Sequence, residues 1–233
     1  MAERTYNIRI SRDEFHDQLS QGIPHGSIVL LEGAYGAGKS ILSQRIAYGL
    51  LENGYRVTII STELTVKDFI DQMYSLGYKI SSHLLSNRLI FMPVYPLVGR
   101  LKERVDFLSK LMRAKEIFAS DIIIFDTFSS LVSHSLSGDE RSIETLGFFK
   151  RLSGLGKSII LTVDPDELDD KVLAHFRSDS QMYLNIVVSQ IGDMINRTIV
   201  VKRYSNAETR FSPTIGFRVE PNVGLVLEIT AVV

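Results

Sequence analysis

The segment Gly33-Ala34-Tyr35-Gly36-Ala37-Gly38-Lys39-Ser40 constrains this chain more than any other feature of its sequence. It matches the pattern G-x-x-x-x-G-K-[ST], in which glycines let successive backbone N–H groups point inward toward phosphate oxygens. An apolar run at 27–32 precedes it as a predicted buried strand, and an amphipathic segment at 41–50 follows it as a predicted helix. Strand, loop and helix in this order predict a P-loop; the alternative is a chance glycine-rich turn.

The residue types in this loop predict contacts with a nucleoside triphosphate. The backbone of 33–38 is expected to cradle the phosphates, and the following helix directs its positive end at the same charges. Lys39 is expected to reach the β- and γ-phosphates, and the Ser40 hydroxyl to ligate Mg²⁺. Ile41, just beyond the loop, is a candidate neighbour of the base. The sequence therefore predicts ATP and Mg²⁺ as ligands.

The composition argues against several other classes of function. The 233 residues carry 26 lysines and arginines against 27 aspartates and glutamates, which does not indicate a strongly basic nucleic-acid binder. The chain has no cysteine, which excludes disulfides, cysteine-ligated zinc and thiol catalysis. Its five histidines are scattered, and we interpret them as surface or packing residues instead of metal ligands.

The sequence shows neither the pattern of a signal peptide nor that of a membrane-spanning helix. Residues 1–6 lack the basic and then apolar layout of a signal peptide. The longest apolar runs, such as 122–125, are far shorter than the ~20 residues that a membrane-spanning helix needs. We therefore expect a cytoplasmic protein that contacts a membrane only through its partners.

Strand-like and helix-like segments alternate as far as residue 163. After the P-loop helix, a helix is expected to begin at an N-cap, Thr65, and to end at Gly77. The remaining expected elements are strands at 56–61, 89–94, 121–128 and 158–163, and helices at 100–118 and 140–152. Continuous apolar strands separated by helices predict a parallel sheet with both faces covered.

The sequence changes character from Met182 onward. Four β-branched runs separated by turn signals predict antiparallel hairpins at one edge of the sheet, at 183–191, 197–204, 216–220 and 225–230. The expected fold class is therefore α/β, with a mainly parallel sheet, helices on both faces and C-terminal antiparallel hairpins. No linker-like stretch interrupts the chain, so one domain spanning 1–233 is expected.

The segment at 121–126 predicts the acidic partner that a P-loop requires. Asp126 follows four buried-type residues, so its carboxylate is expected at the carboxyl edge of the sheet, where ligands of α/β proteins bind. There it can hold the water shell of Mg²⁺, as in a Walker B motif. The alternative is an aspartate that only caps the following turn.

Glu63 ends the predicted strand that follows the P-loop helix. A carboxylate at this place can orient or deprotonate the water that attacks the γ-phosphate, which makes Glu63 a candidate catalytic base. The alternative is a glutamate that interacts with the dipole of the helix starting near Thr65. The residues themselves leave both interpretations open.

Two polar residues, Thr162 and Asp164, lie at the end of the predicted strand 158–163. A side chain there can sense the γ-phosphate, and Thr162 is the candidate sensor. The acidic run 164–170 favours a helix start and a solvated face. Clustered acids at this edge argue against a path for DNA, for which basic or aromatic residues are needed.

The order of these parts resembles the KaiC-like branch of the RecA-fold ATPases. The segment Gly22-Ile23-Pro24-His25-Gly26-Ser27 is similar to that branch's lead-in to the P-loop strand. Glu63 after a strand, Asp126 in the Walker B position and the hairpin tail agree with it, and the resemblance extends from about Ile10 to the end. A single domain of this size with Thr62-Glu63-Leu64 further resembles the accessory proteins of the archaellum, the archaeal flagellum.

This resemblance implies an ATP-binding protein at the cytoplasmic base of the membrane-embedded archaellum motor, with a role in motility. It implies contact with the motor ATPase FlaI and with the scaffold ring around it. Members of the wider group form rings, often hexameric, with nucleotide at the subunit contacts, so a homo-oligomer is expected. No nucleic-acid partner is expected.

Two departures from the KaiC-like pattern bear on hydrolysis. The wider family carries two adjacent glutamates after the strand, whereas here Glu63 is followed by Leu64. The family's Lys-x-Arg pair, which reaches a neighbour's γ-phosphate, falls near Lys202 and Arg203, but Tyr204 occupies the arginine position. Loss of an arginine finger lowers phosphoryl transfer by ~10³-fold or more, so weak or no hydrolysis is predicted. The alternative for this basic pair is a solvated strand end.

Three functions remain open on this reasoning. The first is an ATP-binding regulator whose nucleotide occupancy governs docking to FlaI, with little hydrolysis. The second is an active KaiC-like ATPase or autokinase with Glu63 as its base. The third is a RadB-like recombination mediator, because that group also includes single domains of similar length; the near-neutral charge and the run 164–170 argue against it.

Overall fold

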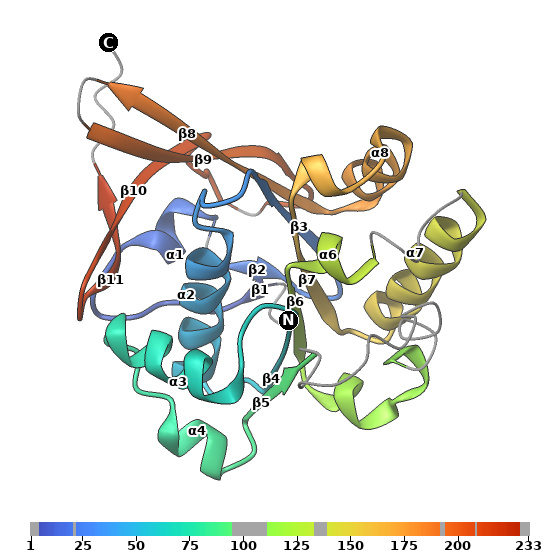
Figure 1. Cartoon of the computed structure of the whole chain (residues 1–233), viewed down its shortest axis with the longest axis horizontal. Coiled ribbons are helices and arrows are strands. Elements are labelled where there is room, and N and C mark those ends of the chain that lie inside the picture. The colour runs from blue at the N-terminus through green and yellow to red at the C-terminus, as the bar shows by residue number, and fades with distance from the viewer. Residues whose placement is uncertain are drawn as a thin grey trace.

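A mixed β-sheet forms the centre of the molecule (Figure 1). The computed structural model describes residues 5–20, 22–94, 111–132, 139–191, 194–207 and 209–228. Within these ranges the main sheet has nine strands in the order β11-β10-β9-β8-β3-β7-β6-β4-β5. Two short strands, β1 (Thr5–Tyr6) and β2 (Ile23–Pro24), pair separately and antiparallel.

The parallel part of the sheet contains the strand that leads into the P-loop. Its members are β3 (Ile28–Gly33), β4 (Val57–Ser61), β5 (Leu89–Pro93), β6 (Ile122–Asp126), β7 (Ser158–Val163) and β8 (Met182–Ile191). The P-loop strand β3 lies between β7 and β8 and pairs parallel with both. All these strands therefore end at one edge, which is where the sequence places the P-loop and its acidic partners.

The remaining strands extend the sheet by antiparallel pairing, which confirms the predicted hairpins. They are β9 (Met194–Tyr204), β10 (Thr214–Glu220) and β11 (Gly224–Glu228), joined in chain order to β8. A register shift at Tyr183 and Leu184 displaces the pairing between β8 and β9. The last two strands curve alongside α2, and Leu225 of β11 shares a core with that helix (Figure 1).

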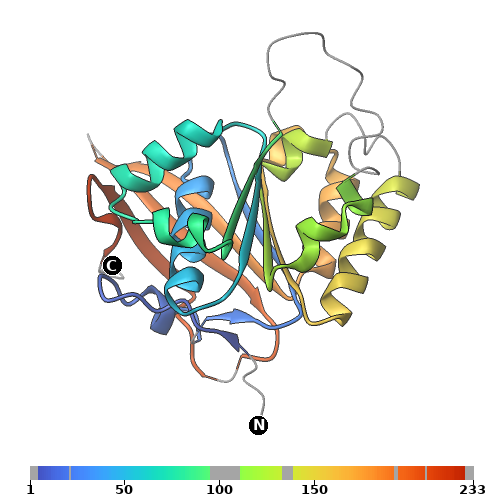
Figure 2. The ribbon, with the colours of Figure 1, turned by 90° about the horizontal axis from the view of Figure 1, so that it is seen from below.

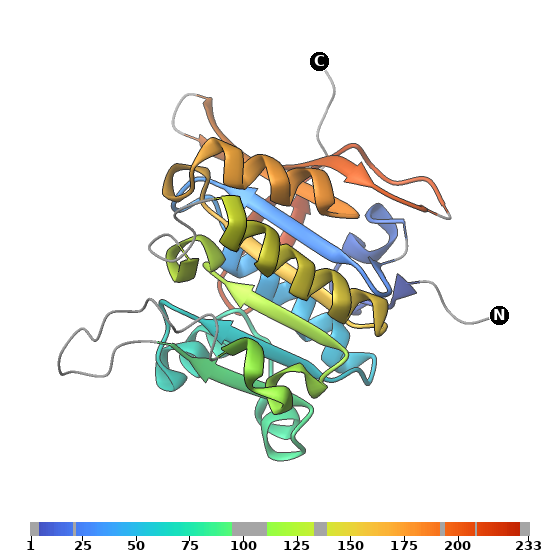
Figure 3. The same cartoon turned by 90° about the vertical axis from the view of Figure 1, so that its right-hand side faces the viewer.

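Helices cover both faces of the sheet, as predicted. Those on one face are α2 (Lys39–Glu52), α3 (Val66–Ser75) and α4 (Ser81–Leu85), while α6 (Phe128–Val132), α7 (Asp139–Gly154) and α8 (Asp170–Asp179) lie on the other (Figures 2 and 3). The shorter elements are α1 (Phe15–Gln18) and the 3₁₀ turns η2 (Lys115–Ala119) and η3 (Pro165–Glu167). No helix within the described ranges is long and apolar enough to cross a bilayer.

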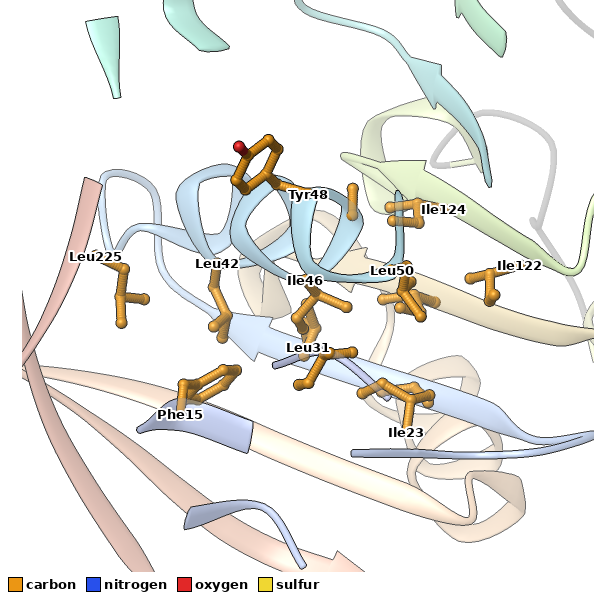
Figure 4. Packing of buried hydrophobic residues seen from close by; sticks show 14 of the residues in the cluster. Phe15, Ile23, Leu31, Leu42, Ile46, Tyr48, Leu50, Ile122, Ile124 and Leu225 are labelled. Atoms are coloured by element: carbon orange, nitrogen blue, oxygen red, sulfur yellow. The ribbon is translucent and has the colours of Figure 1, made fainter. Parts of the chain in front are cut away.

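Neighbouring residues of the parallel strands belong to two different hydrophobic cores. In β3, Leu31 packs with Leu42 and Ile46 of α2, whose side chains point toward it in Figure 4. The preceding residue, Leu30, belongs to the opposite core, together with Phe149 of α7. Because strand side chains alternate between faces, a strand buried on both sides is apolar throughout, as the sequence of β3 is.

A fully buried arginine anchors the P-loop helix to the N-terminal segment. The Arg45 guanidinium on α2 donates to both carboxylate oxygens of Asp13, at 2.7 and 2.5 Å, and to the carbonyl of Ile8 at 3.0 Å. Its cationic centre lies 5.6 Å from the centre of the Phe15 ring. A buried charge is tolerated only when it is paired and hydrogen-bonded, and here both conditions hold. The contact therefore helps to position the helix that begins at the P-loop.

The ends of α3 follow the local rules that predicted them. The Thr65 hydroxyl accepts a hydrogen bond from the backbone N–H of Asp68, so it is the N-cap. Gly77 follows the helix with φ of +73°, a left-handed conformation that side chains disfavour. Both predictions are confirmed.

Two predicted elements differ from the structure. The strand expected at 121–128 ends at Asp126, because Thr127 adopts φ of +62° and Phe128 already begins α6. An apolar residue after the strand therefore starts a helix and packs into the core beside α7. Most of the helix expected at 100–118 lies outside the described residues; in its described part, residues 111–113 are helical as predicted, but a 3₁₀ turn, η2, begins at Lys115.

Candidate functional site: a nucleotide site at the carboxyl edge of the sheet

Glycines shape the P-loop where it joins β3 to α2. A Cβ at Gly33 would lie only 3.1 Å from the carbonyl oxygen of Ile186 on β8, so glycine permits the close approach of the two strands. Gly38 has φ of +102°, and α2 begins directly after it. A Cβ at Gly38 would lie 3.4 Å from the Phe217 ring and 3.7 Å from Cδ of Arg197. The loop is thus pressed against β8, β9 and β10, and larger residues would disturb it.

The other residues of the loop differ in exposure. Ala34, Tyr35 and Gly36 are exposed, with the Tyr35 side chain 90% accessible, whereas Ala37 is buried. Ile41 is half-buried and packs against the core on the α2 face. Its role as a neighbour of the base stays a prediction.

The Lys39 side chain is buried and folds over the start of the loop. Its ammonium group donates to the carbonyl oxygens of Gly33 at 2.7 Å and Ala34 at 2.9 Å. The same nitrogen lies 3.5 Å from a carboxylate oxygen of Asp164. Lys39 is only 8% exposed, so its charge acts in a medium of low polarity, where its attraction to phosphate is strong.

Ser40 of the P-loop lies close enough to Asp126, at the end of β6, for its hydroxyl to affect that carboxyl. Asp126 is 3% exposed. Burial raises the pKa of its carboxyl to about 6, although the Ser40 and Thr162 hydroxyls and the Lys39 charge act in the opposite direction. The structure thus brings together the two residues that the sequence assigned to the metal.

These residues fit a bound Mg²⁺ ion. A serine hydroxyl and a carboxylate are hard oxygen donors of the kind that Mg²⁺ prefers, and Mg²⁺ usually also binds water and the phosphates of its nucleotide. When bound, the ion would neutralise charge on the phosphates. Within this chain, Ser40 would ligate it directly and Asp126 would hold its water shell.

Glu63 lies two residues beyond β4, whose last residue, Ser61, pairs with Asp126 in the sheet. The Glu63 side chain is exposed, and its negative charge contributes to the raised pKa of Asp126. The next residue, Leu64, packs against the hydrophobic core. The arrangement therefore places one carboxylate at the predicted catalytic position, followed by an inward-facing apolar residue.

Thr162 is completely buried in β7 and braces the end of β6. Its hydroxyl oxygen accepts from the backbone N–H of Thr127 at 2.5 Å and lies 3.5 Å from Oδ1 of Asp126. It also donates to the carbonyl of Phe125 at 3.3 Å. The geometry supports the backbone turn after Asp126; contact with a γ-phosphate stays a prediction.

The acidic run 164–170 is only partly the solvated helix start that the sequence predicted. Asp169 is the N-cap position of α8, and most of the run is exposed. Asp164, however, is 7% exposed and faces Lys39. The prediction was wrong for Asp164, because the strand β7 carries the chain directly past the P-loop before η3 begins.

The basic pair on β9 lies apart from the P-loop of its own chain. Lys202 is exposed, and the adjacent Val201 pairs with Leu184, which is level with Leu31 in β3. The pair is thus set back from Gly33, the last residue of β3, and lies two strands away. A contact with a neighbouring subunit stays a prediction for Lys202.

Arg203 is engaged within its own chain. One guanidinium nitrogen donates to the carbonyls of Arg177, Ser178 and Ser180, at 2.7, 2.9 and 3.0 Å, at the C-terminus of α8. This is the favoured place for a cation on a helix. Tyr204, in the position of the family's arginine, is buried and donates to the carbonyl of Gly22 at 3.0 Å.

Sequence reasoning missed two residues that the structure brings to the P-loop. Arg197 of β9 and Phe217 of β10 both approach Gly38, although they are far from it in the sequence. Only the hairpin pairing of Phe217 with Arg197 places them side by side. No local signal distinguishes this arginine from the other basic residues of the tail.

A separate open cavity of about 570 Å³ lies away from the P-loop. It is lined by Arg12, Asp13, Glu14, Gln18, residues 212–215 and residues 226–228. None of these belongs to the loop or to the residues around Asp126. The nucleotide site described above is therefore a different feature of the molecule.

A central parallel strand that leads into a P-loop, with a P-loop serine close to an acid at the end of a nearby strand, defines a RecA-like nucleotide-binding protein. The family model of the KaiC ATPase matches residues 10–220.

Relatives that align over nearly the whole chain show which family within this class the protein belongs to. The chain is 41% identical over 226 residues to the archaeal flagellar ATP-binding protein FlaH of Methanocaldococcus jannaschii, covering 97% of this chain and 96% of that protein. Identity to the same-named protein of Methanococcus voltae is 36% over 225 residues, with 97% of each covered. The crystal structure of the flagellar accessory protein FlaH from M. jannaschii matches with a TM-score of 0.91 at 39% identity, covering 97% of this chain and 100% of that one. The chain belongs to the FlaH family of KaiC-like ATP-binding proteins.

Proposed function

We propose that this protein is an ATP-binding regulator of the archaellum motor, whose nucleotide occupancy controls docking to the motor ATPase FlaI. Its own hydrolysis is weak or absent. It acts in the cytoplasm at the base of the motor, within the scaffold ring, as a homo-oligomer for which a hexameric ring is the expected form. Family membership supports the link to the archaeal flagellum and to ATP.

The observation that carries the proposal is that the buried Asp126 carboxyl and the buried Lys39 ammonium lie at one edge of the sheet, with the Ser40 hydroxyl close enough to Asp126 to affect its pKa. A phosphate-binding lysine, a metal-binding hydroxyl and a carboxylate thus form one continuous site. Such a site can bind a magnesium nucleotide. Binding can then change docking through the difference between its affinities for the docking and non-docking conformations.

Three features around this site support weak hydrolysis. Glu63 is a single exposed acid, because the next side chain, Leu64, packs into the core. Arg203 donates its hydrogen bonds to the end of α8, and the ring of Tyr204 is buried. Phosphoryl transfer needs a cation that stabilises its transition state, and the residues in the expected position, Arg203 and Tyr204, are poorly suited to supply it.

The proposal is tested by retention of FlaI on the immobilised protein, with magnesium and ATP, ADP or no nucleotide. Steady-state ATP hydrolysis is measured in parallel. We expect FlaI to be retained according to the nucleotide, and Lys39→Ala to abolish that dependence. Lys67→Ala is the matched control, because Lys67 is exposed on α3 and forms an ion pair with the exposed Asp71 of the same helix.

Two results would contradict the proposal. One is retention of FlaI that ignores the nucleotide and survives Lys39→Ala. The other is brisk hydrolysis that FlaI does not alter. Either result would remove the distinction between a sensor of ATP and an ordinary ATPase.

A second candidate is an active KaiC-like ATPase or autokinase. The observation in its favour is that the exposed carboxylate of Glu63 lies near enough to Asp126 to raise its pKa, so a base is present at the phosphate end of the site. In that case Glu63→Gln should abolish turnover or phosphate incorporation and leave ATP affinity intact. Glu144→Gln, on the exposed surface of α7, is the control.

A further inference from the structure

The carboxylate of Asp164 is an additional negative charge inside the phosphate site. Asp164 follows β7 directly, and Val163, the last residue of that strand, pairs with Glu32 beside Gly33. Its carboxylate lies 3.5 Å from the Lys39 ammonium, and the residue is 7% exposed. The side chain therefore faces the P-loop lysine and is largely withdrawn from water.

Hydrogen bonds hold this carboxylate in place. Its Oδ1 accepts from the backbone N–H of Asp166 at 3.1 Å, which makes Asp164 the N-cap of η3. Its own backbone N–H donates to the Ser129 hydroxyl oxygen of α6 at 3.0 Å. The Ser129 hydroxyl donates in turn to Glu167 at 2.5 Å. Movement of the carboxylate away from Lys39 would thus disturb η3, and any accompanying movement of the Asp164 backbone would also disturb its bond to Ser129 of α6.

Several carboxylates lie close to the Lys39 ammonium. Asp126 and Glu63 lie on the same edge of the sheet, and Lys39 is the cation that faces Asp164. A terminal phosphate within hydrogen-bonding distance of the Lys39 ammonium would lie roughly 6 Å from the Asp164 carboxylate. At that separation, with a partly screened interior, like charges repel strongly enough to alter affinity by about tenfold or more.

We propose that Asp164 makes this site discriminate between nucleoside triphosphate and diphosphate by competing with the terminal phosphate for the Lys39 ammonium. The inference rests on the proposed function, because it concerns the same nucleotide site. Triphosphate, with its extra negative charge, is weakened more than diphosphate. When the phosphate displaces Asp164 from Lys39, the bonds of Asp164 to Asp166 and Ser129 shift η3 and α6. The conformation of these two elements therefore depends on the third phosphate and not merely on the presence of a nucleotide.

The test compares Asp164→Asn with Asp166→Asn by titration calorimetry. Both variants lose one negative charge, but Asp166 is exposed and its carboxylate is not in contact with Lys39. Asparagine at 164 keeps an acceptor oxygen for the Asp166 N–H. With Mg²⁺ present, we expect Asp164→Asn to raise affinity for the non-hydrolysable β,γ-imido analogue of ATP about tenfold and for ADP by roughly threefold or less. Asp166→Asn should change neither by more than about twofold.

A second variant guards against misfolding. Asp164→Ser removes the charge but keeps a good N-cap, so it should shift the analogue-to-ADP affinity ratio in the same direction. An unchanged ratio in both folded Asp164 variants, or an equal shift in Asp166→Asn, would overturn the inference while the proposed function stands. Failure of the wild-type protein to bind either nucleotide would overturn both.

Amide hydrogen exchange provides a readout at the receiving surface. In the wild-type protein, exchange at 164–167 should be faster with the triphosphate analogue than with ADP. In Asp164→Asn the two nucleotides should give the same exchange. Identical exchange with both nucleotides in the wild-type protein would contradict the transmission to η3.

Discussion

The buried carboxylate of Glu32 is clamped by the guanidinium of Arg177 directly behind the P-loop. Nε of Arg177 donates to one carboxylate oxygen at 2.7 Å, and Nη2 donates to the other. The Tyr183 hydroxyl donates to the first oxygen at 2.8 Å. Because Glu32 precedes Gly33 and Arg177 lies in the last turn of α8, the contact ties that helix to the strand that carries the P-loop.

Further hydrogen bonds link the Arg177–Glu32 contact to Arg203 on β9 and to Lys39 of the P-loop. Arg203 donates to the backbone carbonyl of Arg177, and Lys39 donates to the carbonyl of Gly33, the residue after Glu32. The bonds to Glu32 raise the pKa of Arg177, and burial raises that of Tyr183 to about 12, so Arg177 stays charged and Tyr183 neutral at physiological pH. The position of the P-loop therefore depends on contacts from α8 and β9.

Loss of the clamp should destabilise the protein. Arg177→Met leaves Glu32 buried without its cation, and we expect the free energy of unfolding to fall by about 1–3 kcal/mol, a range reduced because Arg177 is partly exposed. Urea unfolding measures the change. Lys150→Met is the control, because the Lys150–Asp179 pair also holds α8, in this case to α7, but lies near the surface. Equal losses in the two variants would show that the burial of Glu32 has no special effect.

The raised pKa of Asp126 predicts a specific dependence of stability on pH. Since burial raises this pKa from 3.8 to about 6, the folded state binds the proton more tightly than the unfolded state. The resulting contribution to stability is present below about pH 4 and is lost as the pH rises through 6, by about 3 kcal/mol.

Unfolding free energies at pH 4.5, 5.5 and 7, without nucleotide and with a chelator present, measure this effect. We expect Asp126→Asn to lack this decline and to be more stable than the wild-type protein at pH 7. Parallel pH profiles for the two proteins would contradict the assignment of the titration to Asp126.

Substitutions of Arg203 and Lys202 should have different effects on the end of α8. Arg203→Ala removes the hydrogen bonds to the carbonyls at the end of α8, so amide exchange at 176–181 should accelerate. The free energy of unfolding should fall by about 1–3 kcal/mol. Lys202→Ala, at the adjacent exposed position, should leave this exchange unchanged. If Arg203→Ala instead alters only hydrolysis by the assembled protein, a contact with a neighbouring subunit is its main role.

Gly38 should be more sensitive to substitution than glycines of similar backbone conformation. Gly38→Ala strains a residue with φ of +102° that directly precedes Lys39 in the phosphate-binding loop, so we expect nucleotide affinity to fall by about tenfold or more. Gly54→Ala is the control, because its φ of +88° is also left-handed but no atom lies within 4 Å of its Cβ. It should lower stability and leave affinity unchanged; a similar loss of affinity in both variants would contradict the prediction.

The strands of the sheet were predictable wherever the local sequence pattern was strong. Apolar runs ending in a glycine or an acid predicted β3 and β6 and placed Asp126 at the carboxyl edge, as the structure shows. Phe128 was misassigned because an apolar residue after a strand has the same pattern whether the strand continues or a helix begins. The left-handed conformation of Thr127 decided between the two, and its sequence gives no sign of it.

The environment of a charged residue was less predictable than its position. Asp164 lies in a run of acids that is mostly exposed, yet it is buried against Lys39. Arg203 was grouped with Lys202 by adjacency, but side chains on a strand point to alternate faces, and only one of them reaches α8. Neighbours that decide such cases come from distant parts of the chain.

The local sequence was sufficient to predict what kind of site this is. A strand, a glycine-rich loop ending in Lys39 and Ser40, a helix and a second strand ending in Asp126 are local patterns, and local patterns dictate what the backbone and its ends can bind. The groups around that site, from Asp164 and Arg197 at the loop to Arg177 behind it, became known from the folded chain alone. Charge, burial and hydrogen bonding depend on distances in space, and the pairing of strands sets these distances across more than a hundred residues of chain.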